Sequence, residues 1–513
     1  MDIKIKSNKY FATVHSFFIE NKYVILFSLI IGFVAYGYAF ANKLVNWDDL
    51  CNLFSKGATL IGGRWGLELT QYLFLNFSTP WLNGIISLIF LTLSVCFIIK
   101  TFNISKLPFK LLIAGLFIVF PSQIGTFAYM FTCVPYSLAL FLSVLSVYFG
   151  TKPKFKNALF STISLILSLS IYQAYVAVAA SLFVIFVILE LFDNNKTIQE
   201  SLIKGIFLVI ILLISMATYY GITQIVLLVT DTSFSNYTES MINNNSGIID
   251  KIISVYKDYI SIFLWRRQGI VSTNFSRVCH LIILFVLGCL TVVNTVKTKN
   301  ILKIALIIIC CLVFLPIAIN CIKLITPENH LLTKYSFVAI YVFTIILLDK
   351  NNTFALSEFI KKIGVVALSI IVVSNCYIAN ISYLKMHLEY ENEYYLFSSI
   401  MNSVKAYPEF DEDSKIAIIG NFDDPEYFSE FESLRLFYIT GIGGAKNSDS
   451  RNNYFKYYLG IDVDFASNEE IMKISQTDEF KNMKEYPYYG HICEIDNIIV
   501  VKISDVNHQS EVE

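Results

Sequence analysis

The sequence predicts a polytopic α-helical membrane protein of about eleven spans, followed by a small extracytoplasmic α/β domain at the C-terminal end. Two observations lead to this fold class. Of the 513 residues, 55% are hydrophobic and only 15% are charged, whereas soluble domains carry about 25% charged residues. In addition, apolar segments close to the roughly 20 residues needed to cross a bilayer recur along the first three quarters of the chain.

The first apolar segment, Tyr23–Phe40, follows the basic residues 1–22. Ala39-Phe40-Ala41 has the small-x-small form of a signal-peptide cleavage site, but the apolar run exceeds the usual 7–15 residues of a signal core. We therefore expect an uncleaved first span. The other spans are expected at about 81–99, 111–129, 133–149, 157–171, 174–192, 203–229, 279–296, 301–325, 336–349 and 363–382.

Lysines predict the orientation of these spans. They cluster in alternate loops, around Lys106, Lys154, Lys196, Lys299 and Lys361. Cytoplasmic loops are enriched in Lys and Arg. With eleven spans, every lysine-rich loop lies on the side of the N-terminus. We therefore expect the N-terminus in the cytoplasm, and three long loops together with the C-terminal domain outside.

The first outer loop contains an acidic pair, Asp48-Asp49, and then the run Gly62-Gly63-Arg64-Trp65-Gly66. Leu50, Leu53 and Phe54 have the spacing of one apolar helical face, and so do the residues after Trp65. Two short amphipathic helices joined at the glycines would lie along the membrane surface. This arrangement would hold a carboxylate and an arginine just above the bilayer.

The second and third outer loops supply further cations. In the second loop, an apolar helical face runs from Ile249 to Phe263 and is followed by Trp265-Arg266-Arg267. The third loop contains His330 and Lys334. Odd-numbered spans would deliver all three loops to one side of the membrane.

The composition changes after residue 382. We expect residues 1–382 to form the membrane domain, with a catalytic first outer loop at 42–80, and residues 383–513 to form a soluble α/β domain. Acidic residues clearly outnumber basic ones in this C-terminal part. Strands are predicted at Lys415–Gly420 and Asn497–Ile503 from their β-branched residues, and helices at Glu426–Tyr438 and Glu469–Thr477. Gly441-Ile442-Gly443-Gly444 lacks the following helix of a phosphate-binding turn and is interpreted as a plain loop.

These residues suit transfer of a group from a lipid-linked donor. The outer face of the membrane that these spans cross offers neither ATP nor nucleotide sugars. The activated group therefore has to arrive in the lipid. A lipid-phosphate sugar would need a general base for the attacking hydroxyl and cations for the departing phosphate. A carboxylate is ionised at neutral pH, and arginine pairs with phosphate oxygens through a planar fork.

The order of basic N-terminus, one span, Asp48-Asp49 and Gly63-Arg64-Trp65 resembles the bacterial serotype-converting glucosyltransferases, the glucosyltransferase family II membrane proteins. Tyr172-Gln173-Ala174 at a membrane turn is similar as well. The resemblance implies a GT-C-like fold, a polyprenyl-phosphate-glucose donor, an inverting displacement and a cell-surface glycan acceptor such as O-antigen. The sequence departs from the expected pattern in the third loop, where His330 and Lys334 stand in place of an arginine.

The candidate site residues follow from the chemistry and the resemblance together. They are Asp49 ahead of Asp48 as catalytic base; Arg64, Arg266, Arg267, Lys334 and His330 for the donor phosphate; and Trp47, Trp65, Tyr172 and Gln173 for sugar or acceptor. Simpler roles compete: an aspartate can cap a helix, an arginine can extend to lipid headgroups, and tryptophans populate the interfacial belt.

The implied partners are a polyprenyl-phosphate sugar in the bacterial cytoplasmic membrane and a surface glycan, with a lipid-sugar synthase and a flippase acting upstream. No nucleic acid is implied. No cofactor is expected beyond the lipid-linked donor, and no metal ligands are assigned, because the cysteines lack metal-ligand spacing. A divalent-metal requirement stays open.

Other classes of function remain alternatives. A transporter or flippase of lipid-linked sugars would suit eleven spans equally well, but transporters place ionisable residues near the midplane. Spans such as 279–296 are nearly free of charge, which favours chemistry at the surface. A glycan polymerase or ligase would share the outer loops and the lipid-linked substrate. A structural or receptor role for the acidic C-terminal domain is a further possibility.

The lysine pattern makes a topology prediction. Cysteine-accessibility mapping should place positions Lys110 and Asn300 inside, and positions Leu60, Asp250 and Ser450 outside. A C-terminal reporter located in the cytoplasm would contradict the count of spans, and with it the delivery of all three loops to one side.

Overall fold

The chain forms two compact units by its internal contacts. The computed structural model describes residues 2–44, 46–53, 59–74, 77–235, 238–239, 247–264, 273–326, 330–350, 355–411, 413–420 and 448–505. Unit 1 comprises Met1–Asn42 and Lys56–Asn380, and unit 2 comprises Lys43–Ser55 and Ile381–Glu513. The first outer loop expected at 42–80 is therefore shared, with the acidic pair in unit 2 and Arg64 in unit 1.

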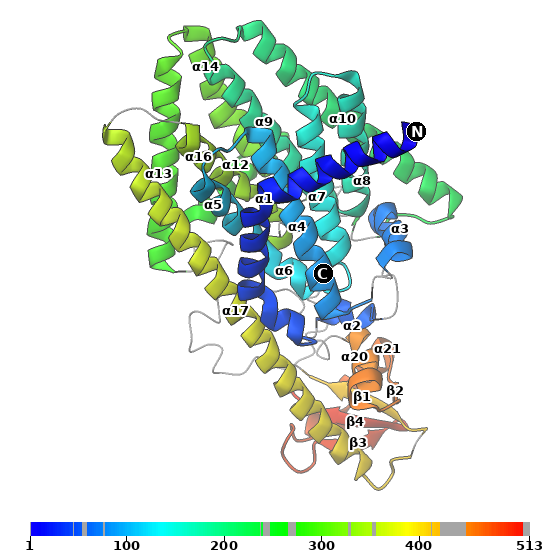
Figure 1. The fold of residues 1–513 in the computed structure, drawn as a ribbon. Coiled ribbons are helices and arrows are strands. Elements are labelled where there is room, and N and C mark those ends of the chain that lie inside the picture. Colours follow the sequence, from blue (N-terminus) through cyan, green and yellow to red (C-terminus); the bar gives the residue numbers. More distant parts are fainter. Residues whose placement is uncertain are drawn as a thin grey trace. The chain divides into compact units, whose positions relative to one another are not determined.

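Unit 1 is built of helices (Figure 1). In chain order they are α1 (Asp2–Ala41), η1 (Leu60–Gly62), α3 (Trp65–Phe74), α4 (Pro80–Phe102), α5 (Leu107–Ile118), α6 (Ser122–Ala128), α7 (Cys133–Gly150), α8 (Phe155–Ile171), η2 (Gln173–Tyr175), α9 (Val176–Phe192), α10 (Ile198–Val229), α12 (Ile248–Leu264), α13 (Asn274–Lys297), α14 (Ile301–Ile309), η4 (Cys310–Phe314), α15 (Leu315–Ile319), η5 (Cys321–Leu324), η6 (Leu331–Phe337), α16 (Val338–Lys350) and the first part of α17 (Ala355–Lys405).

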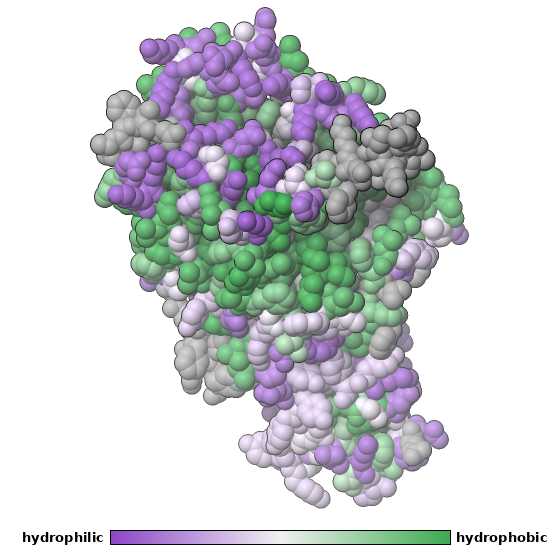
Figure 2. Space-filling view, viewed as in Figure 1, coloured by the Kyte–Doolittle hydropathy of each residue, from purple (hydrophilic) through white to green (hydrophobic). Residues whose placement is uncertain are grey.

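Within the described residues, nine helices are long and apolar enough to cross a membrane, or ten if the bent pair α5 and α6 counts as one span. The shorter apolar helix α8 covers the span expected at 157–171. Each of the eleven predicted segments thus falls on an apolar helix, and the polytopic fold class is confirmed. Figure 2 shows hydrophobic side chains in a broad band over unit 1, with hydrophilic side chains gathered at its upper end in this view.

One predicted span is broken. The segment expected at 111–129 consists of α5 and α6, which meet at an angle of 48°. Pro121 stands at the break and serves as the N-cap of α6. A proline has no N–H for the preceding turn and disfavours helical geometry in the residue before it, so the helix ends and restarts here.

Helix α12 covers the amphipathic segment predicted in the second outer loop. Val255 and Ile262 on one side of it are buried, whereas Ile249, Ile253 and Ile260 are exposed. An exposed row of isoleucines would be unfavourable in water but suits contact with lipid. The helix therefore has one side for the protein and one for an apolar environment.

Unit 2 contains a four-stranded sheet in the order β2-β1-β4-β3. The strands are β1 (Lys415–Ile419), β2 (Asp464–Phe465), β3 (Ile492–Ile495) and β4 (Ile498–Lys502). Both β2 and β4 run parallel to β1, whereas β3 is antiparallel to β4. Strands β1 and β4 and the helix α21 (Asn468–Ser475) match the predicted elements. The predicted helix Glu426–Tyr438 and the glycine run 441–444 lie outside the described residues.

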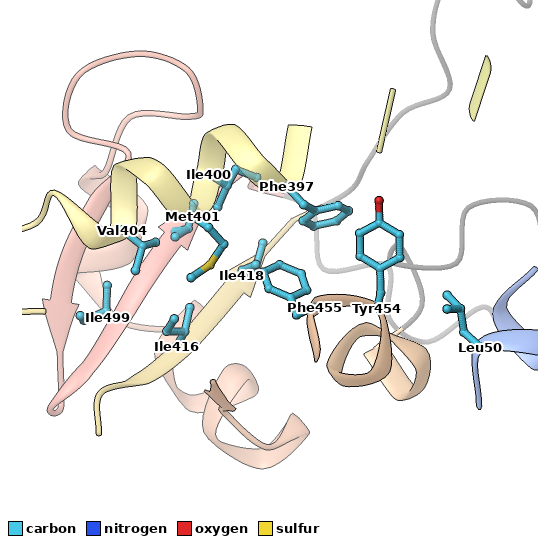
Figure 3. Close-up of a cluster of buried hydrophobic side chains, with 11 residues drawn as sticks. Leu50, Phe397, Ile400, Met401, Val404, Ile416, Ile418, Tyr454, Phe455 and Ile499 are labelled. Atoms are coloured by element: carbon cyan, nitrogen blue, oxygen red, sulfur yellow. The ribbon is translucent and has the colours of Figure 1, made fainter. Parts of the chain in front are cut away.

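Alternate residues of β1 and β4 build two apolar layers, as the period of two in a strand requires. On one face, Ile416 and Ile418 pack with Phe397 and Met401 of the C-terminal part of α17 (Figure 3). On the other face, Ala417 and Ile419 pack in a second cluster that includes residues of α21 and of α22 (Asp478–Asn482). The sheet is therefore covered on both sides.

Candidate functional site

The Gly-Gly-Arg-Trp stretch forms a tight turn between η1 and α3. Gly63 adopts the left-handed conformation, with φ of 70°, and its N–H donates to the carbonyl of Leu60 at 2.8 Å. The N–H of Arg64 donates to the carbonyl of Thr59, also at 2.8 Å. A residue with a Cβ adopts this conformation only with strain, which explains glycine at position 63.

Side chains from two other helical segments bind the carbonyl groups of this turn. The Gln173 Nε2 amide donates to the Gly62 carbonyl at 2.9 Å and to the Tyr219 hydroxyl at 2.9 Å. The Tyr219 hydroxyl in turn donates to the Gly63 carbonyl at 3.0 Å. Gln173 lies in η2, at the break between α8 and α9, and Tyr219 lies in α10. The turn is thereby fixed to the bundle.

Two stacked tyrosines hold the Arg64 side chain. Arg64 Nη1 donates to the Tyr136 hydroxyl at 3.0 Å, and the guanidinium carbon lies 5.6 Å from the centre of the Tyr172 ring, within cation–π range. The rings of Tyr136 and Tyr172 stack with centroids 4.3 Å apart. Both tyrosines are buried, with exposed fractions of 6% and 7%. Tyr172 therefore contacts both Arg64 and Tyr136.

A carboxylate lies on α3, one turn after Arg64. Glu68 accepts a hydrogen bond from the Thr59 hydroxyl at 2.6 Å and another from Gln71 Nε2 at 2.8 Å. Trp65 is half-buried at the start of this helix. Thr59, Glu68 and Gln71 thus form a polar cluster at the turn.

Lys334 lies in a second polar cluster of unit 1. Its exposed fraction is 7%, and its ammonium lies 3.4 Å from the Asp258 carboxylate of α12. Asn320 donates to the same carboxylate at 3.1 Å. His330 is exposed just before η6. The remaining predicted cations, Arg266 and Arg267, lie outside the described residues.

The acidic pair lies on α2 (Trp47–Cys51) in unit 2. Asn46 caps this helix by accepting from the Asp48 N–H at 3.0 Å. The two aspartates differ: Asp48 is exposed, whereas Asp49 has an exposed fraction of 0% and forms an ion pair with Lys43. Trp47 is half-buried.

Tyr458 lies close enough to Asp49 to interact with it electrostatically. Burial, and then the negative charge of Asp49, raise the pKa of Tyr458. Tyr458 belongs to η7 (Phe455–Leu459) of unit 2. The Asp49 carboxylate therefore lies next to the C-terminal part of the chain.

Several residues of these clusters were not predicted from the sequence: Tyr136, Tyr219, Asp258 and Lys43. Weak signals existed for two of them. Tyr136 follows Pro135 at the start of an expected span, and Lys43 precedes the acidic pair within the same loop. Within the described part of the chain, no group of three or more His, Cys, Asp or Glu side chains could hold a metal ion.

A protein-family model described as Glucosyl transferase GtrII matches residues 37–348, which is more than half of the chain. The matched region contains α2, the glycine turn and both polar clusters of unit 1. No curated protein and no solved structure matches the chain.

The turn makes a prediction with an internal control. A Cβ at Gly63 would lie 2.9 Å from the Tyr219 hydroxyl, in a backbone conformation that costs about 1–2 kcal/mol for an L-residue. A Cβ at Gly62 would meet nothing closer than 3.8 Å. Gly63→Ala should therefore raise hydrogen exchange at the Gly63 and Arg64 amides about tenfold or more, whereas Gly62→Ala should change it little. Equal exchange in the two variants would contradict this description.

Proposed function

Because the chain belongs to the glucosyl transferase GtrII family, a family of glucosyltransferases, we propose that it transfers a hexose, most simply glucose, from a polyprenyl-phosphate donor to a cell-surface glycan. The transfer would take place on the outer face of a bacterial cytoplasmic membrane. One observation supports this proposal above the others. Within the matched region, Arg64 is held at a fixed turn by Tyr136 and Tyr172.

The proposed role of Arg64 is to bind the donor phosphate. A guanidinium pairs with phosphate oxygens through two parallel N–H groups, and the pairing loses less entropy when the fork is already oriented. Tyr136 and Tyr172 provide this orientation, and Gln173 and Tyr219 fix the backbone beneath it. We assign Tyr172 and Gln173 to positioning, and leave contact with the sugar or acceptor to the half-buried Trp47 and Trp65.

Further cations would stabilise the departing phosphate. Lys334, oriented by Asp258, and His330 are proposed for this role, and so are Arg266 and Arg267. Charge builds up on the phosphate oxygen as its bond to the sugar breaks. Cations placed there in advance stabilise the transition state more than the ground state.

The proposed reaction is an inverting displacement. An aspartate of α2 takes the proton from an acceptor hydroxyl, whose oxygen attacks the anomeric carbon of the sugar. The bond from this carbon to the phosphate oxygen breaks, and polyprenyl phosphate leaves with the bonding electrons. We propose Asp49 as the base, because Lys43 holds its carboxylate in place, with the exposed Asp48 as the second candidate.

A carrier of lipid-linked sugars is the second candidate function. The ion pair of buried Lys334 with half-buried Asp258 favours it, because ionisable residues inside a helical bundle often mark transport pathways. The family match favours the transferase. A polymerase or ligase would use a lipid-linked glycan in place of a single sugar.

The donor distinguishes these functions. Purified protein should transfer glucose to a glycan acceptor from synthetic polyprenyl-phosphate glucose, and should not do so from a nucleotide glucose. Turnover with the nucleotide sugar alone would reject a lipid-linked donor. Binding of the lipid-linked sugar without turnover, in the presence of glycan extracted from the native membrane, would indicate a carrier.

The assignment of the base is tested with the isosteric variants Asp49→Asn and Asp48→Asn, and with Lys43→Met as the control. Asp49→Asn should lower kcat by about 10²–10⁴, the usual contribution of a general base, with donor binding preserved. Lys43→Met keeps the carboxylate but removes the ion pair that holds it, so kcat should fall, though by less than in Asp49→Asn.

Other outcomes would change the assignment. If Asp48→Asn alone lost activity, the base would be Asp48. If Lys43→Met and Asp49→Asn lost activity and thermal stability equally, the ion pair would be structural. Wild-type turnover in both Asn variants would contradict a catalytic role for the acidic pair.

A further inference from the structure

The short helix that carries the acidic pair is held by the C-terminal part of the chain. Leu50 of α2 is 1% exposed and belongs to the same apolar cluster as Phe397 of α17 and Tyr454 and Phe455 of the C-terminal region. Figure 3 shows Leu50 at the Tyr454 end of this cluster, opposite Val404 and Ile499. A helix of five residues is not stable alone. Its place therefore depends on what it packs against.

A side chain of the C-terminal region also satisfies the end of α2. Asn453 Nδ2 donates to the Leu50 carbonyl at 3.0 Å. The last carbonyl groups of a helix have no partner within the helix and need one elsewhere. Leu50 is bonded to Asp49 in the chain, so this contact fixes the backbone next to the Asp49 carboxylate.

Asn453 belongs to α20 (Ser448–Tyr454), which is itself attached to the sheet. The Arg451 guanidinium, 5% exposed, donates to the Ile418 carbonyl of β1 at 3.4 Å. Burial lowers the pKa of Arg451 to about 10, and the negative charge of Glu393 opposes this change. A chain of contacts thus runs from β1 through Arg451 and Asn453 to α2.

The elements that hold α2 lie beyond the region matched by the family model, which ends at residue 348. We propose that Asn453 is a positioning residue for the transfer reaction, and that α20 of the C-terminal region holds the acidic helix in its reactive orientation. This inference rests on the proposed function, because it takes the base to lie on α2. It makes the C-terminal unit part of the catalytic machinery rather than a separate module.

Asn453→Ala tests the proposal in the full-length protein, with Asn452→Ala as matched control. Asn452 is the exposed neighbour on the same helix. Two measurements are made on each variant: hydrogen exchange of a peptide covering residues 46–53, and steady-state kinetics with polyprenyl-phosphate glucose. Leu50→Ala removes most of the α2 side chain that packs in the apolar cluster, and so disrupts the same attachment in a second way.

The expected result is specific to α2. Asn453→Ala should speed exchange at the Leu50 and Asn52 amides about fivefold, as expected for the loss of one hydrogen bond. It should also lower kcat about 10-fold to 100-fold, with the donor KM changed less than twofold, because misplacement of a catalytic group by about 1 Å costs up to 10²-fold. Leu50→Ala should act in the same direction, and Asn452→Ala should match the wild type.

Three outcomes would overturn the proposal, and they differ in meaning. Unchanged exchange at 46–53 in both Asn453→Ala and Leu50→Ala would show that the C-terminal unit does not hold α2. Faster exchange with unchanged kcat would show that α2 is held but that its orientation does not matter to the reaction. The Asp49→Asn and Asp48→Asn variants then decide separately whether the base assigned under the proposed function is wrong. A fall in kcat with equal loss of protection in β1 would indicate general unfolding of unit 2 and would also reject a specific positioning role.

Discussion

The cluster around Arg64 in unit 1 depends on one constraint. The carbonyl groups of the Gly62-Gly63 turn need hydrogen-bond partners. Non-helical backbone in a membrane protein is tolerated where its polar groups find partners. Gln173 and Tyr219 bind the two carbonyls of this turn. Because the turn cannot rotate freely, Arg64 leaves it in one direction, and Tyr136 and Tyr172 then fix its guanidinium. A backbone requirement therefore sets the position of a charged side chain.

The same physical rule explains the other polar clusters. A charge in an apolar bundle costs several kcal/mol unless it is paired and hydrogen-bonded. Lys334 meets this requirement through Asp258, and Asp258 is in turn bound by Asn320. Among the lysine-rich loops, the Glu190 carboxylate pairs with both Lys196 and Lys204. The Lys334–Asp258 pair joins residues 76 positions apart in the chain, whereas Glu190 pairs with lysines only 6 and 14 positions away.

Features that depend on a short stretch of sequence could be predicted, whereas contacts between distant parts of the chain could not. The spans, α12 and the strands β1 and β4 were predictable, because hydrophobic length and periodicity are properties of a short window. The family resemblance, confirmed by the match over residues 37–348, rested on local motifs as well. By contrast, the partners of Arg64 and Gly63 lie 72 and 156 residues away in the chain. No periodicity identifies such a partner, and so Tyr136 and Tyr219 were missed.

In the first loop, motifs that follow each other in the sequence belong to different structural units. The sequence predicts that Asp48-Asp49 and Gly63-Arg64-Trp65 share one catalytic loop, because they follow each other in the chain. In the structure the acidic pair belongs to unit 2, where Leu50 is buried with residues of α17 and the C-terminal region, and Arg64 belongs to unit 1.

The division has a physical reason. Leu50 is a large apolar side chain on a five-residue helix, and burial of such a side chain stabilises by about 1.5–3 kcal/mol. Leu50 is buried in the apolar cluster of unit 2, against which Leu53 of the same loop also packs. The position of α2 therefore depends on the apolar cluster in which Leu50 is buried. The order of the motifs in the sequence does not indicate which cluster this is.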